Sequence, residues 1–513
     1  MTLGQGGPER YRGPCGIVPD GSGGVFATGT FTGTASLGRF SFTANGLYDA
    51  FVARLDHAGT FLWALQLSGT GAGYSGDYGF GVAPDGTGGV FITGVFAGTA
   101  FFGPFSLTVE PPGYSQIFVS RVNSTGGFEW EVPAGGDSLN YPYAIASDGS
   151  GGAFITGDFK SETATFGGIT LRNQHYDLYQ GTSDIFVARI NSTGGFAWAT
   201  RAGGAGDDSG RGVVTDGAGG ALVIGNFRYP NATFGPITLS IIGSNDIVVA
   251  RLNSQGEFVW AIQVGGDGVD FGRAIAADGA GGAFITGEFT GLVSFGALSL
   301  RTYSTIGSGA NDLFVARVTH EGAFEWAVRA GGPRSTEEKA YAIAPDGANG
   351  VFITGYLNSY FGSVADFGPF RLSIGREDGD VAFVARLNST GGFESAALVS
   401  CLADDQMYGS SAEIYGVAHD SQGGAILLGQ TSERVFIARM SPPQLPPSPP
   451  SSPASPLPSL PLPSPPLPPP VSSSPPSLPS PPLPPPVSSP SPSLPSPPLP
   501  PSPSPSPLPS PSP

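Results

Sequence analysis

The stretch Trp260-Ala-Ile-Gln-Val-Gly-Gly-Asp-Gly-Val-Asp-Phe-Gly-Arg-Ala-Ile-Ala-Ala-Asp-Gly-Ala-Gly-Gly-Ala-Phe-Ile-Thr-Gly-Glu-Phe289 decides the fold. Its centre is Asp-Gly-x-Gly-Gly, beginning at Asp278, and an apolar run that ends in Gly287 follows. The pattern recurs seven times, at intervals of 62 to 74 residues. Its aspartates are Asp20, Asp85, Asp148, Asp216, Asp278, Asp346 and Asp420. A period of this length indicates a repeat architecture in which each copy is one structural unit.

Each copy carries up to four runs with strand character. They are β-branched or aromatic and are bounded by Gly, Asn, Asp and Ser, as in Ala274–Ala276, Ala283–Gly287, Ile185–Arg189 and Phe196–Trp198. A smaller hairpin-like stretch lies between the second and third runs. No helical periodicity is evident, so the sequence predicts an all-β domain.

The first run of each copy fits the inner strand of a closed disc. Four residues before the turn aspartate every copy has Gly or Ala, and one position later every copy has Ile or Val. Small residues suit a place where sheets converge. Four-stranded sheets that cannot bury their own faces must stack, and radial closure leaves only short protected edges. Residues 1–440 are therefore predicted to form a seven-bladed β-propeller of four-stranded blades.

The two chain ends support closure. The seventh copy stops at Met440, after its third strand, and Thr2–Gly7 matches the end of a fourth strand such as Thr200–Gly204. The first residues are expected to supply the strand that the seventh copy lacks. No apolar signal-peptide region is visible, but the chain starts in mid-strand, so a preceding segment stays open.

These residues resemble the SBBP repeats, named for a seven-bladed β-propeller, over nearly all of residues 1–440. The resemblance implies the fold and brings no activity or catalytic residues. In the first five copies the fourth run contains a Trp at one position, the tryptophan slot: Trp63, Trp130, Trp198, Trp260 and Trp326. Copies six and seven depart most from the repeat. They have Ser395 in this slot, an insertion at 356–380 and a linker at 400–413. The tail, residues 441–513, resembles hydroxyproline-rich glycoproteins of plant and algal cell walls.

Composition divides the chain at Met440 and argues against two classes of partner. Of 51 prolines, 37 lie after Met440, where the chain is essentially Pro, Ser and Leu without any charged residue. The tail is predicted to be disordered or in polyproline II. The net charge of −17 thus belongs to residues 1–440, which argues against nucleic acid or an anionic membrane as partners. No apolar run is long enough to span a membrane.

Two repeated polar positions are candidate sites. An arginine ends the third strand of every copy: Arg54, Arg121, Arg189, Arg251, Arg317, Arg386 and Arg439. They could grip a polyanion, but a structural pair with the turn aspartate of the same blade is favoured. Eight residues before the turn aspartate stand Asp77, Asn140, Asp208, Asp270 and Glu338. They could form a ring near the channel that attracts a cation or basic ligand, or bond to their own loops.

Catalytic and metal motifs are absent from the sequence, and no cofactor is expected. There is no Gly-x-Ser-x-Gly, His-Glu-x-x-His or Walker pattern. If catalysis occurs, it should lie where the repeat breaks, at His175 and Asp177 or within 356–380. Gly203–Ser209 and Gly265–Phe271 match a calcium nonapeptide, but their spacing does not allow the tandem stacking that motif needs. Cys15 and Cys401 could pair, although free thiols are favoured.

Asparagine sequons and the tail suggest where the protein works. Sequons begin at Asn123, Asn191, Asn231 and Asn388, and Asn-Ser-Thr-Gly-Gly is also a good turn sequence. The leading hypothesis is a non-enzymatic, extracellular or wall-associated propeller that presents a glycan- or protein-binding face on a Pro-rich stalk. The alternative is an intracellular scaffold whose tail recruits WW, EVH1 or profilin-type domains. An enzyme is the least favoured hypothesis.

Overall fold

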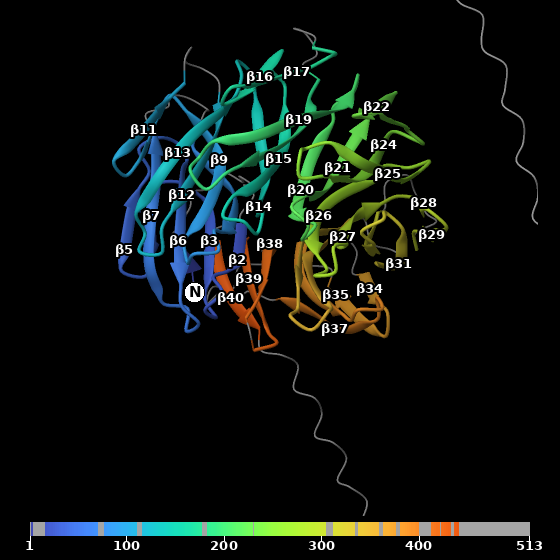
Figure 1. Ribbon diagram of the computed structural model, residues 1–513. Coiled ribbons are helices and arrows are strands. Elements are labelled where there is room, and N and C mark those ends of the chain that lie inside the picture. Colours follow the sequence, from blue (N-terminus) through green and yellow to red (C-terminus); the bar gives the residue numbers. More distant parts are fainter. Residues whose placement is uncertain are drawn as a thin grey trace, which may run out of the picture. The chain divides into compact units, whose positions relative to one another are not determined.

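The chain folds into a seven-bladed all-β propeller with 40 strands in the described residues (Figure 1). The computed structural model describes residues 2–3, 16–69, 76–109, 115–176, 182–228, 230–303, 311–333, 337–358, 363–375, 380–399, 412–420, 422–431 and 435–440; in 2, 3, 363, 412 and 431 it describes the backbone only. The tail, Cys15, Asp177 and Cys401 lie outside these residues, so the predictions made for them stay predictions.

Each blade is an antiparallel sheet of four strands, ordered from the axis outward. The inner strands are β2 (Gly16–Pro19), β8 (Tyr78–Pro84), β14 (Asn140–Ser147), β20 (Ser209–Thr215), β26 (Phe271–Ala277), β32 (Glu337–Pro345) and β38 (Ala412–His419). The second strands are β3 (Val25–Phe31), β9 (Val90–Ala97), β15 (Ala153–Phe159), β21 (Ala221–Arg228), β27 (Ala283–Phe289), β33 (Val351–Asn358) and β39 (Ala425–Thr431). The third strands are β6 (Asp49–Leu55), β12 (Ser115–Val122), β18 (Asp184–Ile190), β24 (Asn245–Leu252), β30 (Asp312–Val318), β36 (Asp380–Leu387) and β40 (Val435–Met440). The outer strands are β7 (Phe61–Gly69), β13 (Phe128–Gly135), β19 (Phe196–Gly204), β25 (Phe258–Gly266), β31 (Phe324–Ala330), β37 (Phe393–Val399) and β1 (Thr2–Leu3).

The turn between the first and second strands explains the repeated Asp-Gly-x-Gly-Gly. In the first blade the Asp20 carboxylate accepts hydrogen bonds from the backbone N–H groups of Ser22 and Gly24, and the intervening glycines have positive φ. The sixth copy has Asn349 where the others have glycine, and it adopts φ 67°. Asparagine tolerates the left-handed conformation better than most residues, so that copy keeps the same turn.

The N-terminus closes the disc, as the sequence predicts. Thr2 pairs with Phe436 and Leu3 with Val435, which makes β1 the outer strand of the seventh blade. In Figure 1 the blue strands β2 and β3 lie beside the orange strands β38–β40. The N-terminal strand is therefore hydrogen-bonded into the last blade, and the first and last blades also pack against each other.

Hairpins inserted between second and third strands do not stay in their own blade. They are β4–β5 (Thr34–Leu37, Phe40–Thr43), β10–β11 (Thr99–Phe102, Phe105–Thr108), β16–β17 (Thr163–Phe166, Ile169–Arg172), β22–β23 (Asn231–Phe234, Ile237–Ser240), β28–β29 (Leu292–Phe295, Leu298–Arg301) and β34–β35 (Ser363–Phe367, Phe370–Ile374). Four of them pair with the outer strand of the preceding blade and extend its sheet to six strands. For example, β22 of the fourth blade pairs with β19 of the third through Ala202 and Phe234. Each such hairpin links two neighbouring blades.

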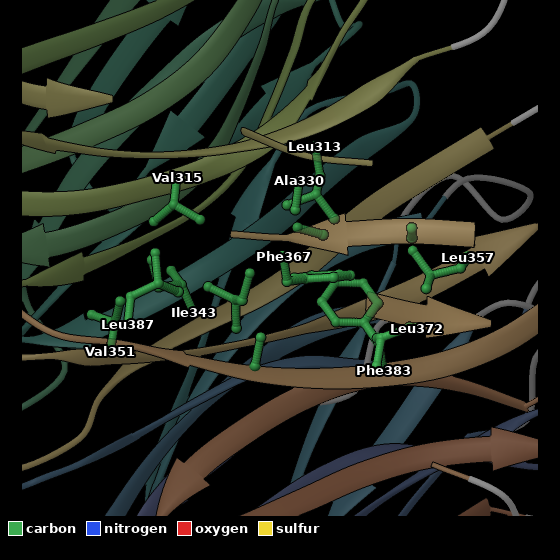
Figure 2. Packing of buried hydrophobic residues seen from close by; sticks show 14 of the residues in the cluster. Leu313, Val315, Ala330, Ile343, Val351, Leu357, Phe367, Leu372, Phe383 and Leu387 are labelled. Atoms are coloured by element: carbon green, nitrogen blue, oxygen red, sulfur yellow. The ribbon is translucent and has the colours of Figure 1, made fainter. Parts of the chain in front are cut away.

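The hydrophobic core lies between blades and not at the centre of the disc. Seven buried clusters each combine residues of two neighbouring blades, and together they include the interface of the seventh with the first. Figure 2 shows one of them, where Leu313 and Ala330 of the fifth blade face Phe367 and Phe383 of the sixth. A blade alone would expose these faces, which is why the repeats fold together.

Tryptophans join the blades by hydrogen bonds. In each of the first five blades the Trp indole Nε1–H donates to a backbone carbonyl in the outer turn of the next blade, as from Trp198 to Ser254 (3.0 Å). All five tryptophan side chains pack in the interfaces between neighbouring blades. Ser395 replaces Trp in the sixth blade because the seventh has no such turn: its third strand ends at Met440 and its outer strand is the N-terminus.

Candidate functional site

Six inner strands carry a β-bulge at the same position, five residues before the turn aspartate. Around it the register with the second strand shifts by one residue, for example from Gly79 opposite Gly94 to Gly81 opposite Thr93. The same shift occurs in β14, β20, β26, β32 and β38. A bulge leaves one residue without a cross-strand partner and redirects its side chain. Each inner strand can therefore present one side chain that the regular pleat would not.

The glycine at the fifth position of each second strand explains how the bulge fits. A Cβ atom on Gly94 would lie 1.9 Å from the carbonyl oxygen of Tyr78, and one on Gly157 would lie 1.8 Å from that of Tyr141. The backbone before the bulge thus approaches the second strand too closely for any side chain. Only glycine, which has no Cβ atom, permits this close approach of the two strands.

The bulged residues form an uneven ring around the central channel. We call these six side chains the bulge ring: Phe80, Tyr143, Arg211, Arg273, Tyr341 and Tyr415. All six line a central cavity of about 470 Å³, together with the small and branched residues of the seven inner strands. The two positions that follow the ring residue are nearly invariant across blades, Gly or Ala and then Ile or Val, while the ring residue itself varies.

Two arginines of the ring differ in their partners. Arg273 forms a bidentate ion pair with Glu288 of β27, which is 2% exposed. Burial alone would lower the pKa of Arg273, but the charge and hydrogen bonds of Glu288 raise it above its ordinary value. Its guanidinium also lies over the Phe271 ring at 5.1 Å. Arg273 is thus a neutralised and fixed part of the wall.

Arg211 has no such counter-ion. Its guanidinium lies 4.1 Å from the ring centroid of Tyr143, a cation–π contact, and its Nε donates to Ser209 Oγ (3.0 Å). Among the described residues no carboxylate lies within ion-pair distance of it. The carboxyl group that influences it is Asp158, whose pKa burial raises to about 7, against the opposing effects of Arg211 and Lys160.

Tyrosines form the other side of the ring. Tyr341 and Tyr415 stack with centroids 5.2 Å apart, and Tyr341 also contacts Tyr356 at 5.5 Å. The Tyr415 hydroxyl donates to Glu413 and accepts from Gln430 Nε2. These contacts fix the orientation of an aromatic surface at the cavity wall.

The five acidic or amide candidates do not ring the channel. All are at most 3% exposed and none lines the cavity, which corrects the expectation of a channel-face ring. Asp208 accepts from the N–H groups of Gly204 and Arg228, and Asp270 accepts from those of Gly266 and Thr290. Asp77 and Glu338 likewise accept from the N–H groups of Ala97 and Gly332, whereas Asn140 donates from Nδ2 to the Ser138 carbonyl. They lie inside the blades because loop N–H and carbonyl groups there need buried partners.

Burial makes three of these carboxyl groups weaker acids than usual. It raises the pKa of Asp77, Asp208 and Asp270 to about 7 in each case, and a neighbouring carboxylate contributes: Asp49, Asp184 or Asp246 respectively. Asp49, Asp184 and Asp246 each have one buried oxygen without a hydrogen-bond partner. The blade interfaces therefore contain pairs of carboxyl groups that compete for ionisation.

Each of the seven repeated arginines pairs with the turn aspartate of its own blade, at 2.8 to 2.9 Å. In the first blade burial raises the pKa of Asp20, but hydrogen bonds from Ser22 and Arg54 outweigh it and hold the pKa below its ordinary value. Three arginines also donate to the next blade's outer turn, as Arg439 does to the His57 carbonyl. These arginines therefore have a structural role, because each one is paired with an aspartate of its own blade.

The sequons lie in hairpins. Asn123, Asn191 and Asn388 each accept, through Oδ1, from backbone N–H groups two and four residues later, which is the turn that the sequence allowed. Asn231 is exposed at the start of β22. The Asn123, Asn191 and Asn388 side chains thus have a structural role whether or not they are modified.

Of the two catalytic candidates His175 and Asp177, only His175 lies among the described residues. His175 follows the β16–β17 hairpin, where its N–H donates to Asn173 Oδ1. In the part of the chain that the structure describes, no group of three or more His, Cys, Asp and Glu side chains could hold a metal ion. No helix among the described residues is long and apolar enough to cross a membrane.

Sequence reasoning missed the bulge ring. The available signal was the one variable position beside two nearly invariant ones: Cys15, Phe80, Tyr143, Arg211, Arg273, Tyr341 and Tyr415 precede the constant Gly or Ala. A regular strand would turn these residues away from the axis, and only the bulge brings them into the cavity. The first-blade member, Cys15, lies outside the described residues.

Comparisons with known proteins give only distant likenesses and leave the activity open. No family model matches the chain. It is similar to an uncharacterized WD repeat-containing protein, L264, of Acanthamoeba polyphaga mimivirus, at 21% identity over 380 residues that cover 62% of this chain. The chain spans about a quarter (27%) of that relative's length.

Solved structures give weaker likenesses. One is a protein of unknown function from Bacteroides caccae, with a TM-score of 0.35 and 10% identity over 72% of this chain and 94% of that one. Another is rhamnogalacturonan lyase YesW, with a TM-score of 0.27 and 10% identity over 85% of this chain and 90% of that one. At these scores neither bears on what this propeller binds.

Proposed function

We propose that this chain is a non-catalytic binding module whose ligand site is the bulge ring at the central cavity. The observation that carries the proposal is the contrast between the variable ring residue, which lines the cavity, and the two nearly constant positions that follow it. Folding explains the constant positions, but it does not require aromatic residues in four blades and arginine in two. Aromatic and arginine side chains converging on a concave site are typical of ligand recognition. The blades themselves we assign to the SBBP type that their sequence resembles.

The ring is suited to binding more than to catalysis. Its side chains are phenylalanine, tyrosine and arginine, and both arginines lie against aromatic rings. Catalysis requires a nucleophile or base in a defined pair with an orienting group, and the ring geometry offers stacking faces and one cation instead. The expected activity is therefore the capture of a ligand at the channel.

A variant pair tests the site. The double substitution Tyr341→Ala and Tyr415→Ala should abolish ligand-induced thermal stabilisation in a screen of glycans and peptides. The control is His57→Ala, an exposed residue in the outer turn of the first blade whose backbone carbonyl, retained in the variant, accepts from Arg439. Equal ligand responses in both proteins, with both folded, would exclude the ring as the binding site.

We further propose that the propeller works outside the cell or in a cell wall, with residues 441–513 as a stalk. The support is the tail sequence, which resembles hydroxyproline-rich glycoproteins, and the four sequons. Extended polyproline II would make the tail roughly 225 Å long at ~3.1 Å per residue. Carbohydrate and hydroxyproline analysis of native protein tests this, since unmodified asparagines and prolines would contradict it.

The tail also supports a second candidate function. Pro-Pro-Leu-Pro recurs in it, and such segments can bind WW, EVH1 or profilin-type domains. In that case the protein would be an intracellular scaffold. A pull-down with the isolated tail should then retain such a domain, whereas a stalk would retain none.

A further inference from the structure

The ring carries one uncompensated cation. Of its two arginines, Arg273 is held by the buried Glu288, while Arg211 has no ion pair among the described residues. Arg211 lines the cavity, with its guanidinium carbon 4.1 Å from the Tyr143 ring centroid and its Nε donating to Ser209 Oγ. These two contacts restrain the guanidinium but leave it without a carboxylate partner. Its terminal N–H groups are therefore available to a ligand in the cavity.

One carboxyl group acts electrostatically on Arg211 without forming an ion pair with it. Asp158, on the neighbouring strand β15, is 5% exposed and its Oδ1 has no hydrogen-bond partner. It balances part of the arginine's charge at a distance but does not form an ion pair with it. An arginine without a direct counter-ion in a concave site is a receptor for a carboxylate or another planar anion.

The rest of the cavity wall points to a ligand with both stacking faces and hydroxyl groups. Phe80, Tyr143, Tyr341 and Tyr415 offer aromatic surfaces. Each inner strand is the terminal strand of its sheet, so its second backbone edge faces the axis. That edge supplies N–H and C=O groups along the cavity. A sugar ring has C–H faces for the aromatic rings and hydroxyls for the backbone groups.

On the basis of the proposed function, we infer that the bulge ring recognises an acidic sugar, a uronic acid within a glycan chain, and that Arg211 binds its carboxylate. The cavity of about 470 Å³ has room for more than one sugar ring. Arg211 then sets the selectivity for the acid, and the tyrosines contribute affinity that does not depend on charge. An acidic peptide would find the cation but would use little of the aromatic surface.

A matched pair of ligands tests the inference on the full-length protein. The probes are a β-1,4-linked glucuronic acid trimer and cellotriose, which share a backbone and differ in the carboxylates. Calorimetric titration should show the acid trimer binding about tenfold or more tightly than cellotriose. Arg211→Gln should remove that preference and leave cellotriose binding unchanged. Arg211→Lys should restore only part of it, because lysine lacks the planar fork.

Controls separate this inference from the proposed function. Arg301→Gln removes an exposed arginine of the β28–β29 hairpin and should change neither affinity. If both trimers bind equally through the tyrosines, the acid selectivity is wrong and the proposed function stands. If neither trimer nor any other screened ligand responds to ring substitutions, the proposed function itself fails. If inorganic phosphate or a glutamate-rich peptide binds as tightly through Arg211, the sugar assignment is wrong.

Discussion

In four blades, one residue determines whether a buried pair of carboxyl groups has a counter-ion. The position three residues after the tryptophan slot faces the pair and is Gln66, Arg201, Gln263 or Arg329. Arg201 forms an ion pair with Asp184 at 2.8 Å, whereas Gln263 makes only a hydrogen bond to Asp246. The interfaces of the first blade with the second and of the fourth with the fifth thus each bury two carboxyl groups without an arginine at this position, and a proton is the natural substitute.

This predicts that stability depends on pH in a direction opposite to that of an ordinary acidic domain. Burial and the neighbouring Asp246 raise the pKa of Asp270 to about 7. The folded state then binds more protons than the unfolded state between about pH 4 and pH 7, so the free energy of unfolding falls as pH rises through that window. Gln263→Arg should reduce the fall and stabilise the protein by about 1 kcal/mol at pH 8, with little effect at pH 5. Melting temperatures at the two pH values measure it.

The reverse substitution is the matched control. Arg201→Gln removes the cation from the equivalent pair, Asp184 and Asp208, where burial likewise raises the pKa of Asp208 to about 7. Its destabilisation should be larger at pH 8 than at pH 5. Equal losses at both pH values would mean that packing, and not the charge of the carboxyl pair, determines the effect.

At the scale of elements, the blades are held together by contacts between each outer turn and the preceding blade. The turn containing Ser254 receives the Trp198 indole N–H, and a Cβ atom on its Gly256 would lie 2.6 Å from that indole ring. Glycine is therefore required where the turn rests on the ring. The sequence showed the Trp slot and the Gly turn as separate repeats, and only the structure shows that they belong to adjacent blades.

Trp198→Phe should destabilise the propeller by about 1–3 kcal/mol, because it loses this interblade hydrogen bond and part of the packed area. Ser395→Trp restores the consensus residue in the sixth blade but should give no gain, since the seventh blade has no outer turn to contact. Chemical denaturation measures both. A stabilising Ser395→Trp would show that the tryptophan acts through its own blade, contrary to the interface described above.

The hairpins and bulges mark the limit of sequence-based prediction at this scale. Strand positions, turns and the inner-strand assignment follow from local patterns, because alternation and turn residues report local backbone geometry. The pairing of β22 with β19 does not, since nothing in Asn231–Phe234 specifies a neighbouring blade as its partner. The bulge at Arg211 is hidden for a similar reason: a register shift depends on the paired strand and leaves no mark on its own alternation.

At the scale of the whole molecule, the closing of the disc could be predicted from the sequence, because the seventh copy lacks a fourth strand. A missing outer strand and a matching N-terminal fragment require each other, and Thr2 and Leu3 indeed pair with β40. The ligand was not predictable at the same level. Seven equivalent blades explain how the disc forms, but recognition depends on the residues in which the blades differ, and these carry no shared pattern to search for.

Because the N-terminus closes the disc, we expect the two ends of the chain to contribute unequally to the stability of the propeller. Deleting residues 1–3 removes the outer strand of the seventh blade and exposes the edge of β40, so the melting temperature should fall and the amides of β38–β40 should exchange faster. Deleting residues 441–513 removes far more chain but no strand of the propeller, since the last strand ends at Met440. The melting temperature should then stay within about 1 °C, because a charge-free Pro/Ser/Leu segment adds no core. Hydrogen exchange on both truncations decides the matter: if losing the tail loosens β38–β40 as much as losing Met1–Leu3 does, the seventh blade is not closed by the N-terminus alone.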